Sequence, residues 1–187
     1  MSARDLPNLI TALRIVLVAP ILWFLLHESY REALVLFFVA GFSDALDGLL
    51  AKQFGWTSRL GAMLDPLADK LLLIGTIVVL GLLGQLPAWL VVLVILRDVV
   101  IVAGAAAYHY LIEPLEASPL LISKLNTLAQ LTLVLAVIFA NAVAALPWWL
   151  RELLILATAL TTVASGAAYV WQWGRRALHK GRRVDVE

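Results

Sequence analysis

The sequence predicts an all-α integral membrane protein with six transmembrane helices, and two observations carry that prediction. The chain is 63% hydrophobic and only 14% charged, and its mean hydropathy is +0.94, which is typical of a polytopic membrane protein rather than a soluble domain. Its apolar residues also fall into runs that reach the ~20 residues needed to cross a bilayer. We therefore expect one membrane domain that covers residues 1–187.

The apolar runs give the approximate place of each helix. The expected helices lie near Asn8–Leu26, Ala33–Ala51, Leu64–Leu83, Ala88–Leu111, Lys124–Ala140 and Pro147–Trp173. Their connections are short and leave no room for a second, soluble domain. The sequence shows no internal repeat, which argues against a transporter built from inverted repeats. Because Met1–Pro7 is short and polar, we expect no separate signal or transit peptide before the first helix.

Basic residues set the expected orientation. They crowd the C-terminal tail at Arg175, Arg176, Lys180, Arg182 and Arg183. By the positive-inside rule both termini then lie in the cytoplasm, where the tail would meet anionic lipid and not nucleic acid. The expected location is a bacterial inner membrane, with the mitochondrial inner membrane as the alternative. The chain has no cysteine, which excludes disulfides, thiolate catalysis and cysteine metal sites.

Four aspartates in the second and third expected helices stand out in this apolar sequence. Asp44 and Asp47 are three residues apart and Asp65 and Asp69 are four apart, so each pair shares one helix face. One acid at the centre of a membrane helix costs roughly 2.5–3.5 kcal/mol, so four acids together call for one or two divalent cations. Oxygen ligands without cysteine or nearby histidine favour Mg2+, Mn2+ or Ca2+ over zinc. The alternative is that they are helix-end acids solvated in a cytoplasmic loop.

The spacing around these aspartates resembles the signature of the CDP-alcohol phosphatidyltransferases. The matching order is Asp44-x2-Asp47-Gly48-x2-Ala51-Lys52-x8-Gly61-x3-Asp65-x3-Asp69. Members of this family are membrane enzymes that transfer a phosphoalcohol or phosphatidyl group from a CDP-linked donor and release CMP. The family usually has Arg where this chain has Lys52, which keeps the charge but loses the bidentate fork.

This resemblance, together with the expected orientation, implies an active-site cavity at the cytoplasmic ends of the second and third helices. Two divalent cations, Mg2+ or Mn2+, would be held by Asp44, Asp47 and Asp65, with Asp69 as general base on the acceptor hydroxyl and a further metal contact. The expected nucleotide-binding residues are Asp44, Gly48, Ala51, Lys52, Arg59 and Gly61. Likeness to the family also implies a homodimer. The residues alone leave direct transfer and a covalent intermediate open, and the resemblance implies direct attack.

Polar residues in three other helices are candidates for binding the acceptor or its phosphate. Arg14 lies in the run PNLITALR, which resembles the family's N-terminal segment, with capping and snorkelling as the alternative. Arg97 and Asp98 lie midway along the fourth helix, where the resemblance places an acceptor pocket and where a buried ion pair that only fixes packing is the alternative. Lys124 and Asn126 begin the fifth helix and either line a cavity mouth or merely snorkel and cap.

Within the family, the whole chain is most similar to the cardiolipin synthases of the eukaryotic type, which join CDP-diacylglycerol to phosphatidylglycerol. Phosphatidylglycerophosphate synthases, which use glycerol 3-phosphate, come next and typically carry Lys where Asn126 stands. A dianionic acceptor phosphate would need that charge more than a lipid headgroup does, so Asn126 favours phosphatidylglycerol as the acceptor. A cation transporter and a non-catalytic scaffold are the alternatives from other classes, and neither needs the complete motif.

Overall fold

The chain folds entirely into helices over the residues that the structure describes. The computed structural model describes the backbone of residues 6–54, 59–111 and 120–184, and the side chains of residues 12–43, 67–107, 120–173 and 175. The helices are α1 (Leu6–Leu26), α2 (Tyr30–Phe54), α3 (Arg59–Leu82), α4 (Ala88–Leu111), α5 (Leu121–Ala142) and α6 (Trp148–Val184). The predicted all-α fold is therefore confirmed, and most helix ends lie within a few residues of their expected positions.

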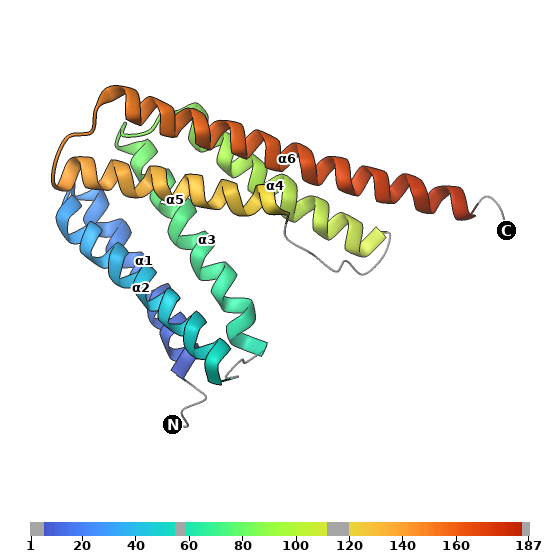
Figure 1. Cartoon of the computed structure of the whole chain (residues 1–187), viewed down its shortest axis with the longest axis horizontal. Coiled ribbons are helices and arrows are strands. Elements are labelled where there is room, and N and C mark those ends of the chain that lie inside the picture. Colours follow the sequence, from blue (N-terminus) through green and yellow to red (C-terminus); the bar gives the residue numbers. More distant parts are fainter. Residues whose placement is uncertain (1–5, 55–58, 112–119, 185–187) are drawn as a thin grey trace. The chain divides into compact units, whose positions relative to one another are not determined.

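The last helix differs most from its prediction. α6 has 37 residues and continues past Trp173 to Val184, through the segment expected to be a basic tail (Figure 1). The apolar pattern ends at Trp173, but Ala177 and Leu178 interrupt the basic residues beyond it and no proline follows. The residues after Trp173 are therefore compatible with a helix, although they are too polar to extend the apolar stretch.

Three helices contain stretches long and apolar enough to cross a membrane, judged on the described residues. These stretches are Ala88–Ala107 in α4, Leu121–Ala142 in α5 and Trp148–Trp173 in α6, and α1 adds a shorter apolar stretch, Ala12–Leu26. Large apolar side chains on these helices are exposed, among them Trp148 at 79% and Leu121 at 78%. Such faces suit lipid, and the helices indicate a multi-pass membrane protein.

The chain forms two compact units, the first of which contains residues 1–87 and 134–147. In it α1 packs against both α2 and α3 (Figure 1). The core is apolar, with Ile21 and Leu25 of α1, Phe37 of α2 and Ile77 and Leu80 of α3 all buried. This packing fixes the two helices that carry the aspartate motif.

Two helices of the first unit end in the same hydrogen-bonded turn. At the end of α3, Gly84 has a φ of 69°, and the backbone N–H of Gln85 donates to Leu80 O at 2.8 Å. Glu28 takes the same left-handed conformation after α1, with a φ of 57°. These are Schellman caps, in which a left-handed residue closes the helix. The cap after α1 turns the chain directly into α2.

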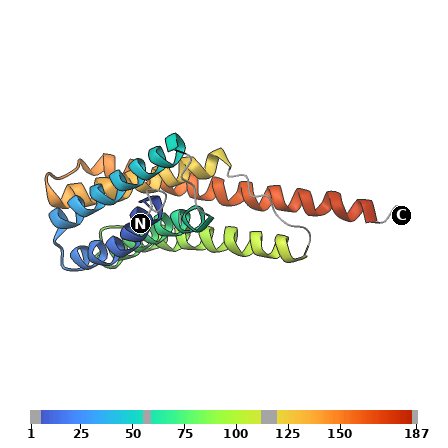
Figure 2. The same ribbon diagram turned by 90° about the horizontal axis from the view of Figure 1, so that it is seen from below.

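The second unit contains residues 88–133 and 148–187. Its helices α4 and α6 run alongside each other (Figure 2). Gly104 of α4 lies beneath the ring of Trp173 of α6, so closely that a Cβ at position 104 would overlap ring atoms. Trp173 also contacts Tyr169, with ring centroids 5.3 Å apart. Trp173 therefore packs against α4, whereas Trp148 and Trp171 are exposed, which is typical of interfacial residues.

Substitution of Gly104 tests this close approach. Because a larger side chain must displace the ring of Trp173, Gly104→Val should lower the free energy of unfolding by about 1–3 kcal/mol. A Cβ at Gly41 would meet no atom within 4 Å, so Gly41→Ala is the matched control and should be neutral or slightly stabilising. Thermal unfolding of both variants in detergent checks the prediction. Wild-type stability of Gly104→Val would show that the ring moves aside freely.

Candidate functional site

The aspartate motif lies on two helices of the first unit. Asp44 and Asp47 are in α2, and Asp65 and Asp69 are in α3, so the expected spacing of three and four does fall on helical backbone. Of the four, only the side chain of Asp69 is described. No group of His, Cys, Asp or Glu that could hold a metal occurs among the described side chains, which exclude those of Asp44, Asp47 and Asp65.

The expected nucleotide-binding residues also lie outside the described side chains. This holds for Asp44, Gly48, Ala51, Lys52, Arg59 and Gly61. Their backbone belongs to the end of α2 and the beginning of α3. Their role and the position of the expected cavity therefore remain predictions.

Arg14 of α1 forms an ion pair with Asp69 of α3. Its Nη1 donates to Asp69 Oδ1 at 2.9 Å. The Arg14 side chain is only 1% exposed, whereas that of Asp69 is 53% exposed. A buried guanidinium must meet acceptors, and this pair satisfies part of that need while tying α1 to α3. The structure thus brings together two predicted site residues that are 55 positions apart in sequence.

Arg97 of α4 joins three helices of the second unit. Its Nη1 donates to Asp98 Oδ1 at 2.5 Å, and its Nη2 donates to Ser123 Oγ of α5 at 2.7 Å and Ser165 Oγ of α6 at 2.5 Å. Arg97 is 8% exposed, and its stem passes Gly166, which leaves room for it. Asp98 neutralises the charge, and the two serines fix the plane of the guanidinium.

Asn126 of α5 faces a row of hydroxyl groups on α6. Thr161 Oγ1 and Thr162 Oγ1 donate to Asn126 Oδ1 at 3.1 Å and 2.8 Å, and Asn126 itself is fully buried. One turn further along α5, Thr158 Oγ1 donates to Ala129 O at 3.3 Å. The residue numbers of the partners on α6 fall as those on α5 rise, so the two helices run antiparallel.

Lys124 does not belong to this buried cluster. It is exposed, whereas Asn126, two residues later, is buried. Because α5 is a regular helix from Leu121, residues two apart point in different directions. The expectation that both line one cavity mouth therefore finds no support in the position of Lys124.

The sequence analysis did not single out several buried polar residues of the second unit. These are the buried Gln130, Thr158, Thr162 and Ser165, together with the half-buried Ser123 and Thr161 that bond to them or to Arg97 and Asn126. A signal for them existed, because the hydroxyl residues recur every three or four positions along the last helix and Gln130 follows Asn126 by one turn. Among the described residues of the second unit, Arg97 Nε, Asn126 Nδ2 and Gln130 Nε2 are buried without a hydrogen-bond partner.

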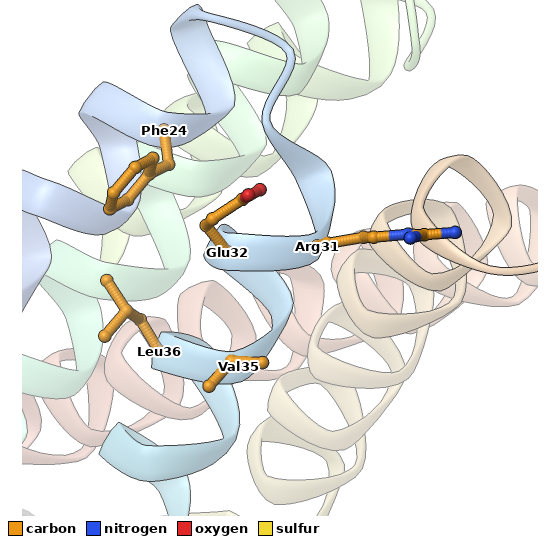
Figure 3. A pocket seen from close by; sticks show the side chains of 5 residues that line it. All are labelled: Phe24, Arg31, Glu32, Val35 and Leu36. Atoms are coloured by element: carbon orange, nitrogen blue, oxygen red, sulfur yellow. The ribbon is translucent and has the colours of Figure 1, made fainter.

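A surface pocket of about 440 Å3 lies elsewhere in the first unit, at the beginning of α2. Phe24 of α1 and Glu32, Val35 and Leu36 of α2 line it, while the Arg31 side chain extends away from the other four (Figure 3). Arg31 Nε donates to Ala142 O at 3.0 Å. Glu32 is separated from the first motif aspartate by twelve residues of α2, about 18 Å of helix at 1.5 Å per residue. The pocket is therefore not part of the aspartate site.

Comparison with known families gives a match over most of the chain. Residues 4–165 match the family model described as CDP-alcohol phosphatidyltransferase. The matched range contains every residue that the sequence analysis assigned to the site.

Individual relatives fall into two groups. The chain is 35% identical to the Rattus norvegicus cardiolipin synthase (CMP-forming) and 34% identical to the Homo sapiens protein, in each case over 91% of this chain and 62% of the relative. It is 29% identical to the Bacillus subtilis CDP-diacylglycerol–glycerol-3-phosphate 3-phosphatidyltransferase, over 88% of this chain and 93% of the relative. The chain thus spans less than two thirds of the length of the mammalian relatives.

A double-mutant cycle tests the pair of Arg14 and Asp69. Because the two side chains are in direct contact, Arg14→Gln and Asp69→Asn should show a coupling free energy of about 0.5–3 kcal/mol for unfolding. The same cycle between Arg14→Gln and Glu32→Gln, an exposed acid of the same unit at the beginning of α2, should give no coupling. Additive effects of Arg14→Gln and Asp69→Asn would contradict the contact.

Proposed function

Because the chain belongs to the CDP-alcohol phosphatidyltransferase family, we propose that it moves a phosphatidyl group from CDP-diacylglycerol to a hydroxyl of phosphatidylglycerol, giving cardiolipin and CMP. The observation that carries the proposal is the similarity of nearly the whole chain to proteins named cardiolipin synthase (CMP-forming). The motif aspartates on α2 and α3 support the general chemistry. The buried, uncharged Asn126 supports the choice of acceptor.

Two divalent cations, Mg2+ or Mn2+, suit the donor set of Asp44, Asp47, Asp65 and Asp69, which offers only carboxylate oxygens. When bound, they would neutralise the diphosphate of the donor and stabilise the CMP leaving group. Lys52 and Arg59 would meet phosphate oxygens as further positive charges. Gly48, Ala51 and Gly61 would leave room for the nucleotide beside the backbone.

The transfer itself exchanges one bond to phosphorus for another. Asp69 takes the proton of the acceptor hydroxyl, whose oxygen then forms a bond to the phosphorus of the phosphatidyl group. The bond from that phosphorus to the CMP oxygen breaks, and CMP leaves. Arg14, 2.9 Å from Asp69 Oδ1, is the positioning residue that holds this carboxylate from α1.

The proposed identity of the acceptor rests on the polar residues of the second unit. Arg97 and Asp98 form a neutralised pair, and Asn126 contributes a neutral amide. Together they present little free positive charge, which suits the glycerol headgroup of phosphatidylglycerol better than the dianionic phosphate of glycerol 3-phosphate. Lys124 would act at the exposed end of this region. The similarity to the Bacillus subtilis relative favours glycerol 3-phosphate as the second candidate.

The membrane setting completes the proposal. Six transmembrane helices with both termini and the aspartate motif on the cytoplasmic side would give a CDP-activated donor direct access to the motif. A bacterial inner membrane is the proposed location and a homodimer the proposed assembly. The domain would extend over the whole of residues 1–187.

Replacement of one motif aspartate tests the proposed chemistry. Asp47→Asn should lower CMP release from CDP-diacylglycerol at least roughly a hundredfold, because a neutral amide cannot replace a carboxylate ligand. Glu32→Gln is the matched control, an exposed acid earlier on the same helix, and should retain wild-type activity. Both variants should remain folded in detergent. Undiminished CMP release by Asp47→Asn would refute the ligand role.

Replacement of Asn126 tests the proposed acceptor. Asn126→Lys should raise the ratio of kcat/KM for glycerol 3-phosphate to that for phosphatidylglycerol by about tenfold or more, since it adds a cation that a dianion can meet. The measurement is a competition between the two acceptors with quantification of both lipid products. An unchanged ratio would remove Asn126 as the basis for acceptor choice.

A further inference from the structure

The part of α6 that follows its apolar stretch has no role in the proposed function. Residues 174–184 contain five basic residues and no acidic one, and they continue α6 without a proline. In both views this end of α6 extends past the end of α4, beside which the helix runs (Figure 1, Figure 2). The basic residues therefore stand on a regular helix, whose geometry determines which of them share a face.

Hydroxyl groups mark the face of α6 that contacts the rest of the second unit. Thr158 Oγ1 donates to a backbone carbonyl of α5, and Thr162 Oγ1 donates to Asn126 Oδ1. Ser165 Oγ accepts a hydrogen bond from Arg97 Nη2 at 2.5 Å. Residues three and four apart share a helix face, so these three hydroxyl residues form one line along α6. This hydroxyl line faces the residues proposed to bind the acceptor.

Three basic residues continue the hydroxyl line beyond the apolar stretch. Five turns of an α-helix contain about 18 residues, so Arg176, Lys180 and Arg183 have the same rotational positions as the three hydroxyl residues. The other two basic residues, Arg175 and Arg182, lie about a quarter turn or more away from this line. Small or apolar residues occupy the remaining side of the segment, at Gly174, Ala177, Leu178, Gly181 and Val184.

Helix α5, which lies against the hydroxyl line, does not reach these basic residues. Leu120 N, just before the beginning of α5, donates to the Tyr169 hydroxyl at 3.5 Å. Because α5 runs antiparallel to α6, it begins at the level of Tyr169 and extends toward the beginning of α6. Arg176 follows Tyr169 by about two turns. The face of α6 that α5 covers thus continues, past the end of α5, as a line of cationic residues.

Two exposed side chains indicate where α6 leaves the apolar layer of the membrane. Trp171 is 69% exposed, and Arg175 is exposed one turn later. Tryptophan is enriched at the membrane–water interface. Arg183 follows Trp173, the last residue of the apolar stretch, by about 15 Å of helix at 1.5 Å per residue. A headgroup layer of about 5–8 Å and a Debye length of about 8 Å leave the basic residues close enough to attract lipid phosphates.

We propose that Arg176, Lys180 and Arg183 bind the phosphodiester of an anionic phospholipid and so collect phosphatidylglycerol on the side of α6 that leads to Asn126. The inference rests on the proposed function, in which phosphatidylglycerol is the acceptor. Basic segments next to a membrane attract anionic lipids, whereas a zwitterionic lipid offers them no net charge. The three residues raise the local concentration of the acceptor lipid and take no part in the exchange of bonds at phosphorus.

Transfer kinetics in mixed micelles test this lipid site. Arg176→Gln/Lys180→Gln should raise the KM for phosphatidylglycerol, expressed as a mole fraction, about fivefold at an unchanged kcat, because two of the three cations are lost. Arg175→Gln/Arg182→Gln is the matched control, since it removes the same charge from the same segment away from the line, and its KM should change less than about twofold. High salt should reduce the difference between the wild type and the first double variant. Both double variants should unfold at the wild-type temperature.

Lipid association provides a second readout that does not depend on activity. The full chain is reconstituted in phosphatidylcholine bilayers that contain a trace of spin-labelled phosphatidylglycerol or spin-labelled phosphatidylcholine, and the motionally restricted fraction of each label is measured. The wild-type protein should favour phosphatidylglycerol by about threefold. Arg176→Gln/Lys180→Gln should lose most of this preference, and the control should keep it.

Equal effects of the two double variants would overturn the inference, because the attraction would then come from net charge and not from the line of three residues. An unchanged KM in Arg176→Gln/Lys180→Gln would also overturn it, as would a wild-type protein that shows no preference for spin-labelled phosphatidylglycerol. A lipid preference that depends on the line, in a protein that releases no CMP with any acceptor, would support the lipid site and overturn the proposed function.

Discussion

The cost of placing charge in an apolar helical protein governs what the structure does with its polar residues. Arg14 and Arg97 are both almost entirely buried, and each donates to an aspartate. A buried guanidinium without such partners would be strongly destabilising. Each arginine therefore requires its neighbours to stay in place, and through them it ties helices together, α1 to α3 in one unit and α4 to α5 and α6 in the other.

The two units use polar groups in different ways. The first unit carries the aspartate motif and pairs Arg14 with its last carboxylate, so its polar chemistry is ionic. In the second unit the buried Arg97 and the partly buried Asp98 neutralise each other, and the hydroxyl groups of Ser123 and Ser165 accept further hydrogen bonds from Arg97. Ionic groups suit a diphosphate with its cations, whereas amides and hydroxyls suit an alcohol. This difference is the physical basis of the proposal that residues of the first unit bind the donor and residues of the second unit bind the acceptor.

Local patterns in the sequence predicted the helices well. The apolar runs predicted both ends of α4 to the residue and most other helix ends to within a few residues, but not the end of α6, because helix position in a membrane protein depends largely on length and hydrophobicity. The pair Arg97 and Asp98 was also predictable, since the partners are neighbours. The contact between Arg14 and Asp69 was not, because nothing local links residues on different helices. Ser123, Ser165 and Gln130 were missed for the same reason: their importance comes from the helix opposite.

Two differences between the sequence-based prediction and the structure have specific causes. The continuation of α6 beyond Trp173 follows helix propensity rather than hydropathy, so a pattern based on membrane spans could not find it. Trp173 stands at the end of an apolar run, a position typical of interfacial residues, but its ring packs on Gly104 of α4, where no side chain is in the way. The arrangement of Asp44, Asp47 and Asp65 is a prediction from spacing, since their side chains lie outside the described part of the chain.

The most direct test of the central claim is a transfer assay on the purified wild-type protein. It receives CDP-diacylglycerol with Mg2+ or Mn2+, and phosphatidylglycerol and glycerol 3-phosphate are offered in parallel, with CMP release followed and the lipid products identified by mass. The account predicts CMP and cardiolipin with phosphatidylglycerol and little product with glycerol 3-phosphate. Phosphatidylglycerophosphate as the main product would contradict the proposed acceptor, and absence of CMP with either acceptor would contradict the proposed activity.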